Sequence, residues 1–184
     1  MAIRTRHLVA AKLRTMTPQA LREESANIVR LITEWSVFQE AEVVAGFYPT
    51  HQEPQIKPLL QKIMAEKKLL LPKVLGNGLM DFHQVFTFDV LRSGAFGLME
   101  PSLSAQPWLG SDPDIVLVPG MTFNNFGERV GKGGGYYDRY LAKSKNSIYV
   151  GLGFSVQMVA GNIPQHQYDV RMNYIVSPTE IFKV

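Results

Sequence analysis

Residues 118–141 decide the fold, and they read Val118-Pro-Gly-Met-Thr-Phe-Asn-Asn-Phe-Gly-Glu-Arg129-Val-Gly-Lys132-Gly-Gly-Gly-Tyr-Tyr-Asp138-Arg-Tyr-Leu141. An apolar run at 115–118 enters this stretch, and an aromatic, helix-like run leaves it. The glycines therefore lie where a strand passes into a helix, which is where α/β proteins bind anions. Glycines at 131 and at 133–135 have no Cβ atom and tolerate positive φ. Consecutive backbone N–H groups can then converge on phosphate oxygens.

Charged side chains flank this glycine run. Arg129 supplies a forked cation and Lys132 a point cation, a pair that suits a polyanion. Asp138 follows in the first turn of the expected helix, where a Mg²⁺ ion bridging phosphates would need a carboxylate. Each residue alone also has a structural explanation, since the helix dipole favours Asp in a first turn. The stretch matches neither the G-x-x-x-x-G-K-[ST] loop nor the G-x-G-x-x-G fingerprint.

Length and composition predict one globular domain over residues 1–184. Hydrophobic residues make up 46% and charged residues 19% of the 184 positions. The chain has no cysteine, which excludes disulfides and thiolate metal sites and fits a reducing compartment. The charged N-terminus lacks a following apolar segment, and no apolar run approaches 18 residues. We therefore expect a cytoplasmic protein without a membrane partner.

The net charge of +3 is compatible with a nucleic-acid partner or with an anionic small molecule. Lysine and arginine are spread along the chain, and no motif of a nucleic-acid-binding module is present. An anionic small-molecule ligand accounts for the mild basic excess equally well. We expect no nucleic-acid partner.

Hydrophobic periodicity predicts alternating helices and strands. Thr17 is suited to cap a helix that has Pro18 in its first position, and Pro72 is expected to end a strand. A basic segment at 4–14 precedes that helix, and a solvated helix face explains it most simply. The alternation predicts a single-domain, three-layer α/β/α fold with a largely parallel central sheet. The expected helices are 17–38, 55–67, 136–144 and 156–160, and the expected strands are 43–48, 69–71, 115–118, 148–154 and 173–176, with one or two more within 80–88.

Two glutamates stand out beyond the glycine run. Glu53 follows the expected strand 43–48, at the end of a strand where open α/β sheets bind ligands. It is suited either to bind substrate or to supply a negative charge at the start of the next helix. Glu100 precedes Pro101, so its backbone is expected to be extended.

Three segments, 119–123, 127–131 and 133–141, resemble the signature of the 5-formyltetrahydrofolate cyclo-ligases, also called methenyltetrahydrofolate synthetases. Similar features occur at Tyr48 with Glu53, at 96–101 and at 164–169, and their order and spacing hold over nearly the whole chain. The resemblance implies conversion of 5-formyltetrahydrofolate to 5,10-methenyltetrahydrofolate. It further implies that ATP is consumed with Mg²⁺ and that ADP and phosphate are released.

The resemblance also implies roles for individual residues. Arg129 and Lys132 would be catalytic, because they would steady the transferring phosphoryl group, and Asp138 and Asp169 would bind Mg²⁺. Without the resemblance, Asp169 would be interpreted as a surface carboxylate. Glu53 would accept hydrogen bonds from the pterin. The implied ATP-binding set is Arg4, Arg6, Arg129, Gly131, Lys132, Gly133, Gly134, Gly135, Tyr136 and Tyr137, and the implied substrate-binding set is Tyr48, Glu53, Glu100, Lys132, Gly134 and Tyr136.

Three positions depart from the family pattern. Ala2 stands where the family usually has a lysine, and Arg4 is a candidate to replace it. Asn124 and Asn173 stand where aspartates are usual, so each lacks a negative charge that bears on metal affinity or local geometry. Two other functions stay open: an ATP-dependent enzyme for another pterin or formamide on the same scaffold, and a noncatalytic protein that binds folate or nucleic acid. We expect a monomer that acts on 5-formyltetrahydrofolate, with or without a polyglutamate tail.

Overall fold

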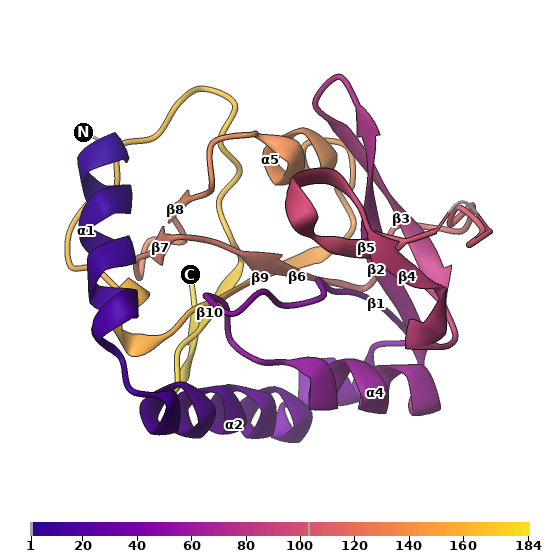
Figure 1. Ribbon diagram of the computed structural model, residues 1–184, viewed down its shortest axis with the longest axis horizontal. Helices are drawn as coiled ribbons and strands as arrows, with labels where there is room; N and C mark the ends of the chain where they lie inside the picture. Colours follow the sequence, from indigo (N-terminus) through magenta and orange to yellow (C-terminus); the bar gives the residue numbers. More distant parts are fainter. Residues whose placement is uncertain (1, 103) are drawn as a thin grey trace.

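The computed structural model describes residues 2–102 and 104–184, with side chains from residue 6 onward. Its centre is a seven-stranded sheet in the order β11-β10-β9-β6-β1-β2-β3 (Figure 1). The five inner strands are parallel, and the two edge strands, β3 and β11, are antiparallel to their neighbours. This confirms the predicted α/β fold with a largely parallel sheet. The strands are β1 (Val43–Ala45), β2 (Lys68–Gly76), β3 (Leu79–Val85), β6 (Ile115–Pro119), β9 (Ile148–Leu152), β10 (Tyr174–Val176) and β11 (Ile181–Lys183).

Helices cover both faces of the sheet. Helices α2 (Pro18–Glu34) and α4 (Lys57–Glu66) run along one face, and the short helix α5 (Tyr136–Leu141) lies on the other (Figure 1). Alternate side chains of β6 serve the two faces. Ile115 and Leu117 belong to the core under α2 and α4, whereas Val116 and Val118 belong to the core under α5. A strand buried on both faces explains the continuous apolar run that precedes the glycines.

The remaining elements surround this sandwich. Helix α1 (Ala2–Thr15) packs Val9 and Leu13 against Phe154. The sequence did not predict two small hairpins, β4 (Leu91–Ser93) with β5 (Met99–Pro101) and β7 (Thr122–Phe123) with β8 (Arg129–Val130). Strands of two or three residues carry too little periodicity to be recognised. Among the described residues, no helix combines the length and the apolar character needed to cross a membrane.

The helix predicted over residues 17–38 is interrupted. It begins as expected, because the Thr17 hydroxyl accepts a hydrogen bond from Ala20 N. It ends at Glu34, and Trp35 adopts an extended conformation before helix α3 (Ser36–Glu40). The Trp35 ring packs edge-on against Tyr174 of β10, with centroids 4.7 Å apart. Tertiary packing of this ring accounts for a break that helical periodicity does not reveal.

The prediction that Pro72 ends its strand is wrong, because β2 continues to Gly76. The carbonyl of Leu70 accepts from Gly46 N on the β1 side, and the register of β1 with β2 stops at Leu70. Two residues later, Pro72 faces the same side, where β1 has already ended. Its missing N–H therefore removes no ladder hydrogen bond, and pairing with β3 continues through Phe82.

Other predicted boundaries shift inward. The strand expected over 43–48 ends at Ala45, and the helices expected over 55–67 and 136–144 cover Lys57–Glu66 and Tyr136–Leu141. The helix expected over 156–160 is a 3-10 turn, Ser155–Gln157. The side chain of Gln157 accepts from Phe154 N and donates to Gly120 O. These bonds tie the turn to the segments that follow β9 and β6.

Gly151 of β9 occupies a position where the core leaves no space for a side chain. A Cβ atom there would lie 2.6 Å from Phe123 and 2.9 Å from Ile175. We expect Gly151→Ala to lower the free energy of unfolding by about 1–3 kcal/mol, because an overpacked core must shift its side chains. Urea denaturation of both proteins would measure this loss. An unchanged midpoint would contradict the packing described here.

Candidate active site

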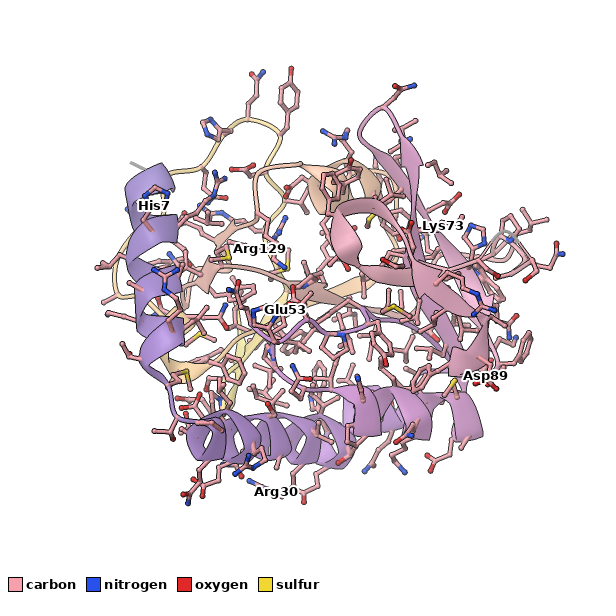
Figure 2. The ribbon with its side chains drawn as sticks, viewed as in Figure 1. His7, Arg30, Glu53, Lys73, Asp89 and Arg129 are labelled. Atoms are coloured by element: carbon pink, nitrogen blue, oxygen red, sulfur yellow. The ribbon has the colours of Figure 1, made fainter. Side chains whose placement is uncertain are left out.

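The sheet has a topological switch point between β1 and β6. From β1 the chain continues to β2 and β3 on one side, and from β6 it continues to β9 and β10 on the other. Open α/β sheets bind ligands in the crevice outside the carboxyl ends of two such strands. Strand β1 leads to the loop with Glu53, and β6 leads through the β7–β8 hairpin to residues 131–135, here called the glycine loop. Figure 2 labels Glu53 and Arg129, one from each of these connections.

An ion pair joins the two connections at this crevice. Lys132 Nζ lies 2.8 Å from Glu53 Oε1. The lysine side chain is 49% exposed, whereas the glutamate side chain is 7% exposed. Glu53 Oε2 accepts hydrogen bonds from the backbone N–H and the hydroxyl of Thr50, at 2.8 and 3.0 Å. Glu53 thus has one oxygen fixed by its own loop and one paired with the half-exposed ammonium group of Lys132.

The glycine loop has the backbone conformations that its sequence predicts. Gly133 has φ 104° and Gly135 has φ 65°, a region that residues with a Cβ atom rarely adopt. A Cβ atom on Gly134 would lie 2.7 Å from the ring of Tyr136. Helix α5 has six residues, so its dipole is weak. A ligand at this loop would therefore interact mainly with the backbone N–H groups and only weakly with the dipole of α5.

Helix α1 reaches the glycine loop through Arg6. Its Nε donates to the carbonyl of Gly131 at 2.9 Å. A Cβ atom on Gly133 would lie 3.4 Å from Nη1 of the same guanidinium, so the two terminal nitrogens lie beside the loop. The fold thus brings a predicted ATP-binding residue to the glycine loop across 125 positions of the sequence. Arg4 and Ala2 belong to the same helix, but their side chains lie outside the described part of the structure.

Arg129 and Asp138 form a second ion pair, behind the loop. Arg129 is 7% exposed, and its Nη2 lies 2.8 Å from Asp138 Oδ1. Val170 N donates to the same oxygen at 3.2 Å. The guanidinium carbon also lies 5.9 Å from the centroid of the Tyr137 ring. Arg129 therefore joins the β7–β8 hairpin to α5 and positions Asp138, and its direct contact with a phosphate stays a prediction.

Asp169 lies next to Val170 in the chain, so the fold brings the two predicted metal-binding carboxylates into adjacent segments. Asp169 Oδ2 accepts from His166 N at 2.8 Å. Asp138 Oδ2 and Asp169 Oδ1 have no hydrogen-bond partner among the described residues. The same residues contain no cluster of three or more His, Asp or Glu side chains suited to a metal ion. Within the described part of the structure, Asp138 and Asp169 thus each offer a cation one carboxylate oxygen that accepts no hydrogen bond.

The predicted folate contacts Tyr48 and Tyr136 are half-buried, and each packs edge-on against a phenylalanine. The centroids of Tyr48 and Phe88 are 5.4 Å apart, and those of Tyr136 and Phe96 are 6.0 Å apart. Phe96 is 77% exposed and has φ 58°, which is strained for a bulky side chain. It was not among the predicted site residues. The signal available for it was an aromatic residue before a glycine, in a segment that already resembled the family.

Glu100 is engaged by the backbone around it. It is extended in β5, as predicted, and its oxygens accept from Val74 N at 2.9 Å and from Ala95 N at 3.1 Å. A Cβ atom on Gly94 would lie 1.8 Å from this carboxylate. Glu100 therefore holds the β4–β5 hairpin, whose loop carries Phe96, against β2. Its predicted direct contact with substrate stays a prediction.

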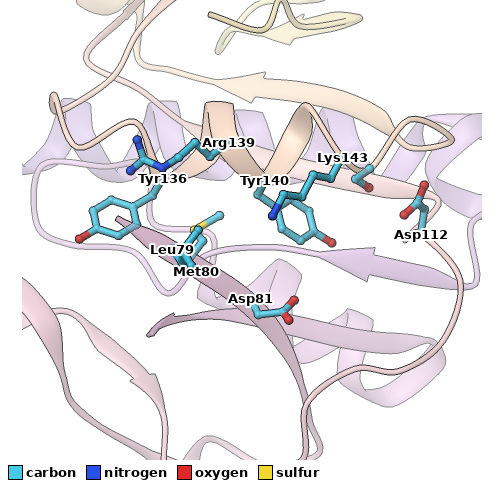
Figure 3. Close-up of a pocket in the computed structure, with 9 residues that line it drawn as sticks. Leu79, Met80, Asp81, Asp112, Tyr136, Arg139, Tyr140 and Lys143 are labelled. Carbon is cyan, nitrogen blue, oxygen red and sulfur yellow. The ribbon is translucent and has the colours of Figure 1, made fainter. Parts of the chain in front are cut away.

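A cavity of about 150 Å³ lies between α5 and β3 (Figure 3). Burial raises the pKa of Tyr140 in its wall to about 12. Arg139 closes one end by donating to the carbonyl of Gly78 at 2.7 Å. Neither Glu53 nor Lys132 lines this cavity, but Tyr136, a predicted folate contact, does. Its lining is Leu79, Met80, Asp81, Asp112, Tyr136, Arg139, Tyr140, Lys143 and Ser144.

The two asparagines that depart from the family pattern have structural partners. Asn124 Nδ2 donates to Glu128 Oε2 and to Gly161 O, each at 2.8 Å. An aspartate at this position would place one carboxylate against another. Asn173 Oδ1 accepts from Tyr149 N at 2.7 Å, a bond that an aspartate oxygen could also make. Both residues stabilise the backbone around them. None of these hydrogen bonds involves Asp138 or Asp169.

Glu128 is a buried carboxylate that the sequence interpretation did not select. Its Oε2 also accepts from Ile163 N at 2.8 Å, and its Oε1 accepts from Arg171 Nη2 at 2.8 Å. The hydrogen bonds from Ile163 and Asn124, followed by the charge of Arg171, hold the pKa of Glu128 below its ordinary value of 4.5 against the effect of burial. Glu128 thereby fixes the segment that carries Asp169 to the hairpin that carries Arg129.

Glu128→Gln is expected to lower the free energy of unfolding by about 1–3 kcal/mol at pH 7, because hydrogen bonds to a charged acceptor are lost. The folded-state pKa is depressed, so the contribution of Glu128 is complete above about pH 4.5 and disappears as pH falls through the lower folded-state pKa. Thermal unfolding from pH 7 to pH 3 should therefore show the two proteins converging in acid. Glu40→Gln, at an exposed position, is the control. A constant difference at all pH values would contradict this role.

A model of the 5-formyltetrahydrofolate cyclo-ligase family matches residues 1–178. The cyclo-ligase of Haemophilus influenzae is 31% identical over 138 residues, covering 72% of this chain and 73% of that protein. A probable cyclo-ligase of Caenorhabditis elegans is 26% identical over 185 residues, covering 93% of this chain and 89% of that protein. The solved 5,10-methenyltetrahydrofolate synthetase of Aquifex aeolicus has a TM-score of 0.87 and 29% identity, covering 99% of this chain and 92% of that chain. With the family model matching nearly its whole length, this chain belongs to the 5-formyltetrahydrofolate cyclo-ligase family.

Proposed function

We propose that this protein converts 5-formyltetrahydrofolate to 5,10-methenyltetrahydrofolate, with ATP and Mg²⁺ required and ADP and phosphate released. The observation that carries the proposal is the 2.8 Å contact between Glu53 and Lys132 at the switch point. A carboxylate suited to pterin N–H donors there touches a cation suited to phosphate. Transfer of a group between two bound substrates requires their sites to meet in this way. Membership of the cyclo-ligase family supports the same assignment.

In this reaction the protein positions the reacting groups of the two substrates and stabilises the charge of the transferring phosphoryl group. The formyl oxygen is a poor leaving group until it attacks the γ-phosphorus of ATP, which breaks the bond to ADP. N10 of the folate then attacks the formyl carbon and loses its proton, and the phosphate leaves as the ring closes. No protein nucleophile takes part. Cations, backbone amides and carboxylates at the crevice suit this task.

The phosphate side of the site is assigned to the glycine loop and its neighbours. Lys132 and the amides of residues 131–135 would hold the γ-phosphate, and the terminal nitrogens of Arg6 would contact the phosphates beside Gly133. Arg129 would act chiefly by orienting Asp138. When bound, Mg²⁺ would neutralise phosphate charge. The free oxygens of Asp138 and Asp169 fit it directly or through water, since Mg²⁺ takes one or two carboxylates together with phosphates and waters.

The folate side of the site is assigned to the β1 connection and to the start of α5. Glu53 Oε1 would accept hydrogen bonds from the pterin once Lys132 turns to the phosphate. Tyr48 and Tyr136 supply half-buried aromatic surface for the rings of the folate. Glu100 would act through the hairpin that it holds against β2. Lys132 is shared by the two sides, which is why its replacement should impair the reaction strongly.

Absorbance at the methenyl-folate band tests the proposal. Purified protein would be mixed with 5-formyltetrahydrofolate, ATP and Mg²⁺, and each would be omitted in turn. We expect the band to grow in the complete mixture and in none of the omissions. A folded protein that gives no band in the complete mixture would refute the proposal.

The competing functions make different predictions. Another ATP-dependent enzyme on this scaffold would turn over a different pterin or formamide faster than 5-formyltetrahydrofolate, which a substrate panel would reveal. A noncatalytic folate-binding protein would bind without consuming ATP. A nucleic-acid-binding protein would show affinity that falls steeply with salt and no turnover. The buried Glu53 in the loop after β1 favours the folate reaction over these.

We also propose a compartment, an oligomeric state and a form of the substrate. A chain without cysteine suits the reducing cytoplasm. The active form is proposed to be a monomer. The substrate would be 5-formyltetrahydrofolate with or without a polyglutamate tail.

A further inference from the structure

Arg139 of α5 connects two parts of the chain that lie far apart in the sequence. Its Nε donates to the carbonyl of Gly78 at 2.7 Å, and its Nη2 donates to the carbonyl of Gly134. Gly78 belongs to the turn at 76–78, here called the β2–β3 turn, and Gly134 belongs to the glycine loop. One guanidinium therefore joins this turn, 61 positions away in the sequence, to the loop assigned to the phosphates of ATP.

Glycines leave the space that the guanidinium of Arg139 occupies. A Cβ atom on Gly78 would lie 2.6 Å from Nη2, and a Cβ atom on Gly135 would lie 2.8 Å from Nη1. Both glycines have positive φ, 74° and 65°. The guanidinium carbon also lies 5.5 Å from the centroid of the Tyr136 ring, and Figure 3 shows the group beside this ring. The guanidinium is therefore held in one place although Arg139 is an exposed residue.

The hydrogen bond to the carbonyl of Gly134 fixes the orientation of a peptide group in the glycine loop. The bond between Gly134 and Gly135 is trans, so its C=O and N–H groups point in opposite directions. An arginine that holds the oxygen on one side therefore directs the N–H to the other. Arg6 holds the carbonyl of Gly131 in the same way at the start of the loop. Among the described residues, the N–H groups of residues 132–135 donate no backbone hydrogen bond, so they remain available to the oxygens of a ligand.

A loop rich in glycine needs support of this kind. Glycine loses more conformational freedom on ordering than any other residue, so an unsupported loop would have to be ordered each time a ligand binds. We propose that Arg139 is a positioning residue for the phosphate site, which holds the glycine loop in its ATP-binding conformation and is itself held by the β2–β3 turn. This inference rests on the proposed function and gives a role to a residue outside the predicted site.

The test measures the affinity of Arg139→Ala for each substrate separately. Isothermal titration gives the Kd for a nonhydrolysable ATP analogue with Mg²⁺ and the Kd for 5-formyltetrahydrofolate. We expect the Kd for the ATP analogue to rise about five- to tenfold, because a released loop must be ordered on binding. The Kd for the folate should change much less, because Tyr136 keeps its contact with Phe96. A lower melting temperature with both Kd values unchanged would make Arg139 merely structural and would overturn the inference.

Two substitutions in the β2–β3 turn separate the contact with Arg139 from the strain of the turn. Gly78→Ala would place a Cβ atom 2.6 Å from Nη2 of Arg139, whereas a Cβ atom on Gly76 would meet no described atom within 4 Å. The two glycines have similar positive φ, 74° and 88°, so both substitutions strain the backbone. Gly78→Ala should weaken binding of the ATP analogue as Arg139→Ala does. Gly76→Ala, the matched control, should leave that binding unchanged.

Combining the two changes tests whether they act through the same guanidinium. The double variant with Gly78→Ala and Arg139→Ala should bind the ATP analogue no more weakly than Arg139→Ala alone. Unchanged affinity for the analogue in folded Arg139→Ala would overturn the inference and leave the proposed function intact. Equal losses of affinity in Gly78→Ala and Gly76→Ala would do the same, because strain in the turn would then explain both. Failure of the unmodified protein to bind the ATP analogue would instead refute the proposed function itself.

Discussion

Lys132→Ala is expected to lower kcat for 5-formyltetrahydrofolate conversion by about 100- to 1,000-fold, the cost of removing one preorganised group that stabilises transition-state charge. Lys132 lies in the glycine loop, 2.8 Å from the carboxylate assigned to the pterin. Its ammonium can therefore stay close to a γ-phosphoryl group that moves towards the folate. Steady-state kinetics with saturating ATP and folate would measure the effect on kcat.

Lys62→Ala provides the control for Lys132→Ala. Lys62 lies on α4 with its side chain 40% exposed, where it pairs with Glu66 four residues later, and surface pairs of this kind contribute little to stability. Its replacement should leave kcat unchanged. The Lys132 variant should remain folded, because that side chain is half exposed. A Lys132→Ala protein with ordinary kcat would remove this lysine from the mechanism.

Glu53→Gln is expected to raise the Kd for 5-formyltetrahydrofolate by about 10- to 100-fold, because hydrogen bonds from the pterin would lose a charged acceptor. The substitution keeps the size of the side chain. Affinity for a nonhydrolysable ATP analogue should change much less, since Glu53 is assigned to the folate. Titration of each ligand separately would distinguish the two effects.

Glu100→Gln gives the comparison for Glu53→Gln. Both oxygens of Glu100 bind backbone N–H groups, so its replacement should reduce stability more than it changes folate affinity. If Glu53→Gln binds folate as tightly as the unmodified protein does, the pterin does not bind at the loop after β1.

Much of the fold could be predicted because its signals are local. The apolar run at 115–118, the cap at Thr17 and the glycines before α5 each determine their own segment. The break at Trp35 and the passage of β2 through Pro72 depend on partners elsewhere, Tyr174 in the first case and the end of β1 in the second. No pattern within either segment contains that information.

For the candidate site, too, the sequence could predict single residues but not their contacts. The sequence identified Glu53, Lys132, Arg129 and Asp138 as candidates, but it could not show which of them pair. Glu53 and Lys132 are 79 positions apart, and the strand order of the sheet brings them together. Arg129 pairs with Asp138, a contact that the sequence did not predict, and its expected contact with the phosphates stays a prediction.

We propose that the protein transfers the γ-phosphoryl group of ATP to the formyl oxygen at the crevice where Glu53 meets Lys132. The most direct test uses 5-formyltetrahydrofolate with ¹⁸O in the formyl group and follows the label during a single turnover by mass spectrometry. The account predicts that the released phosphate carries the ¹⁸O. Label recovered in water or formate, with unlabelled phosphate, would contradict it.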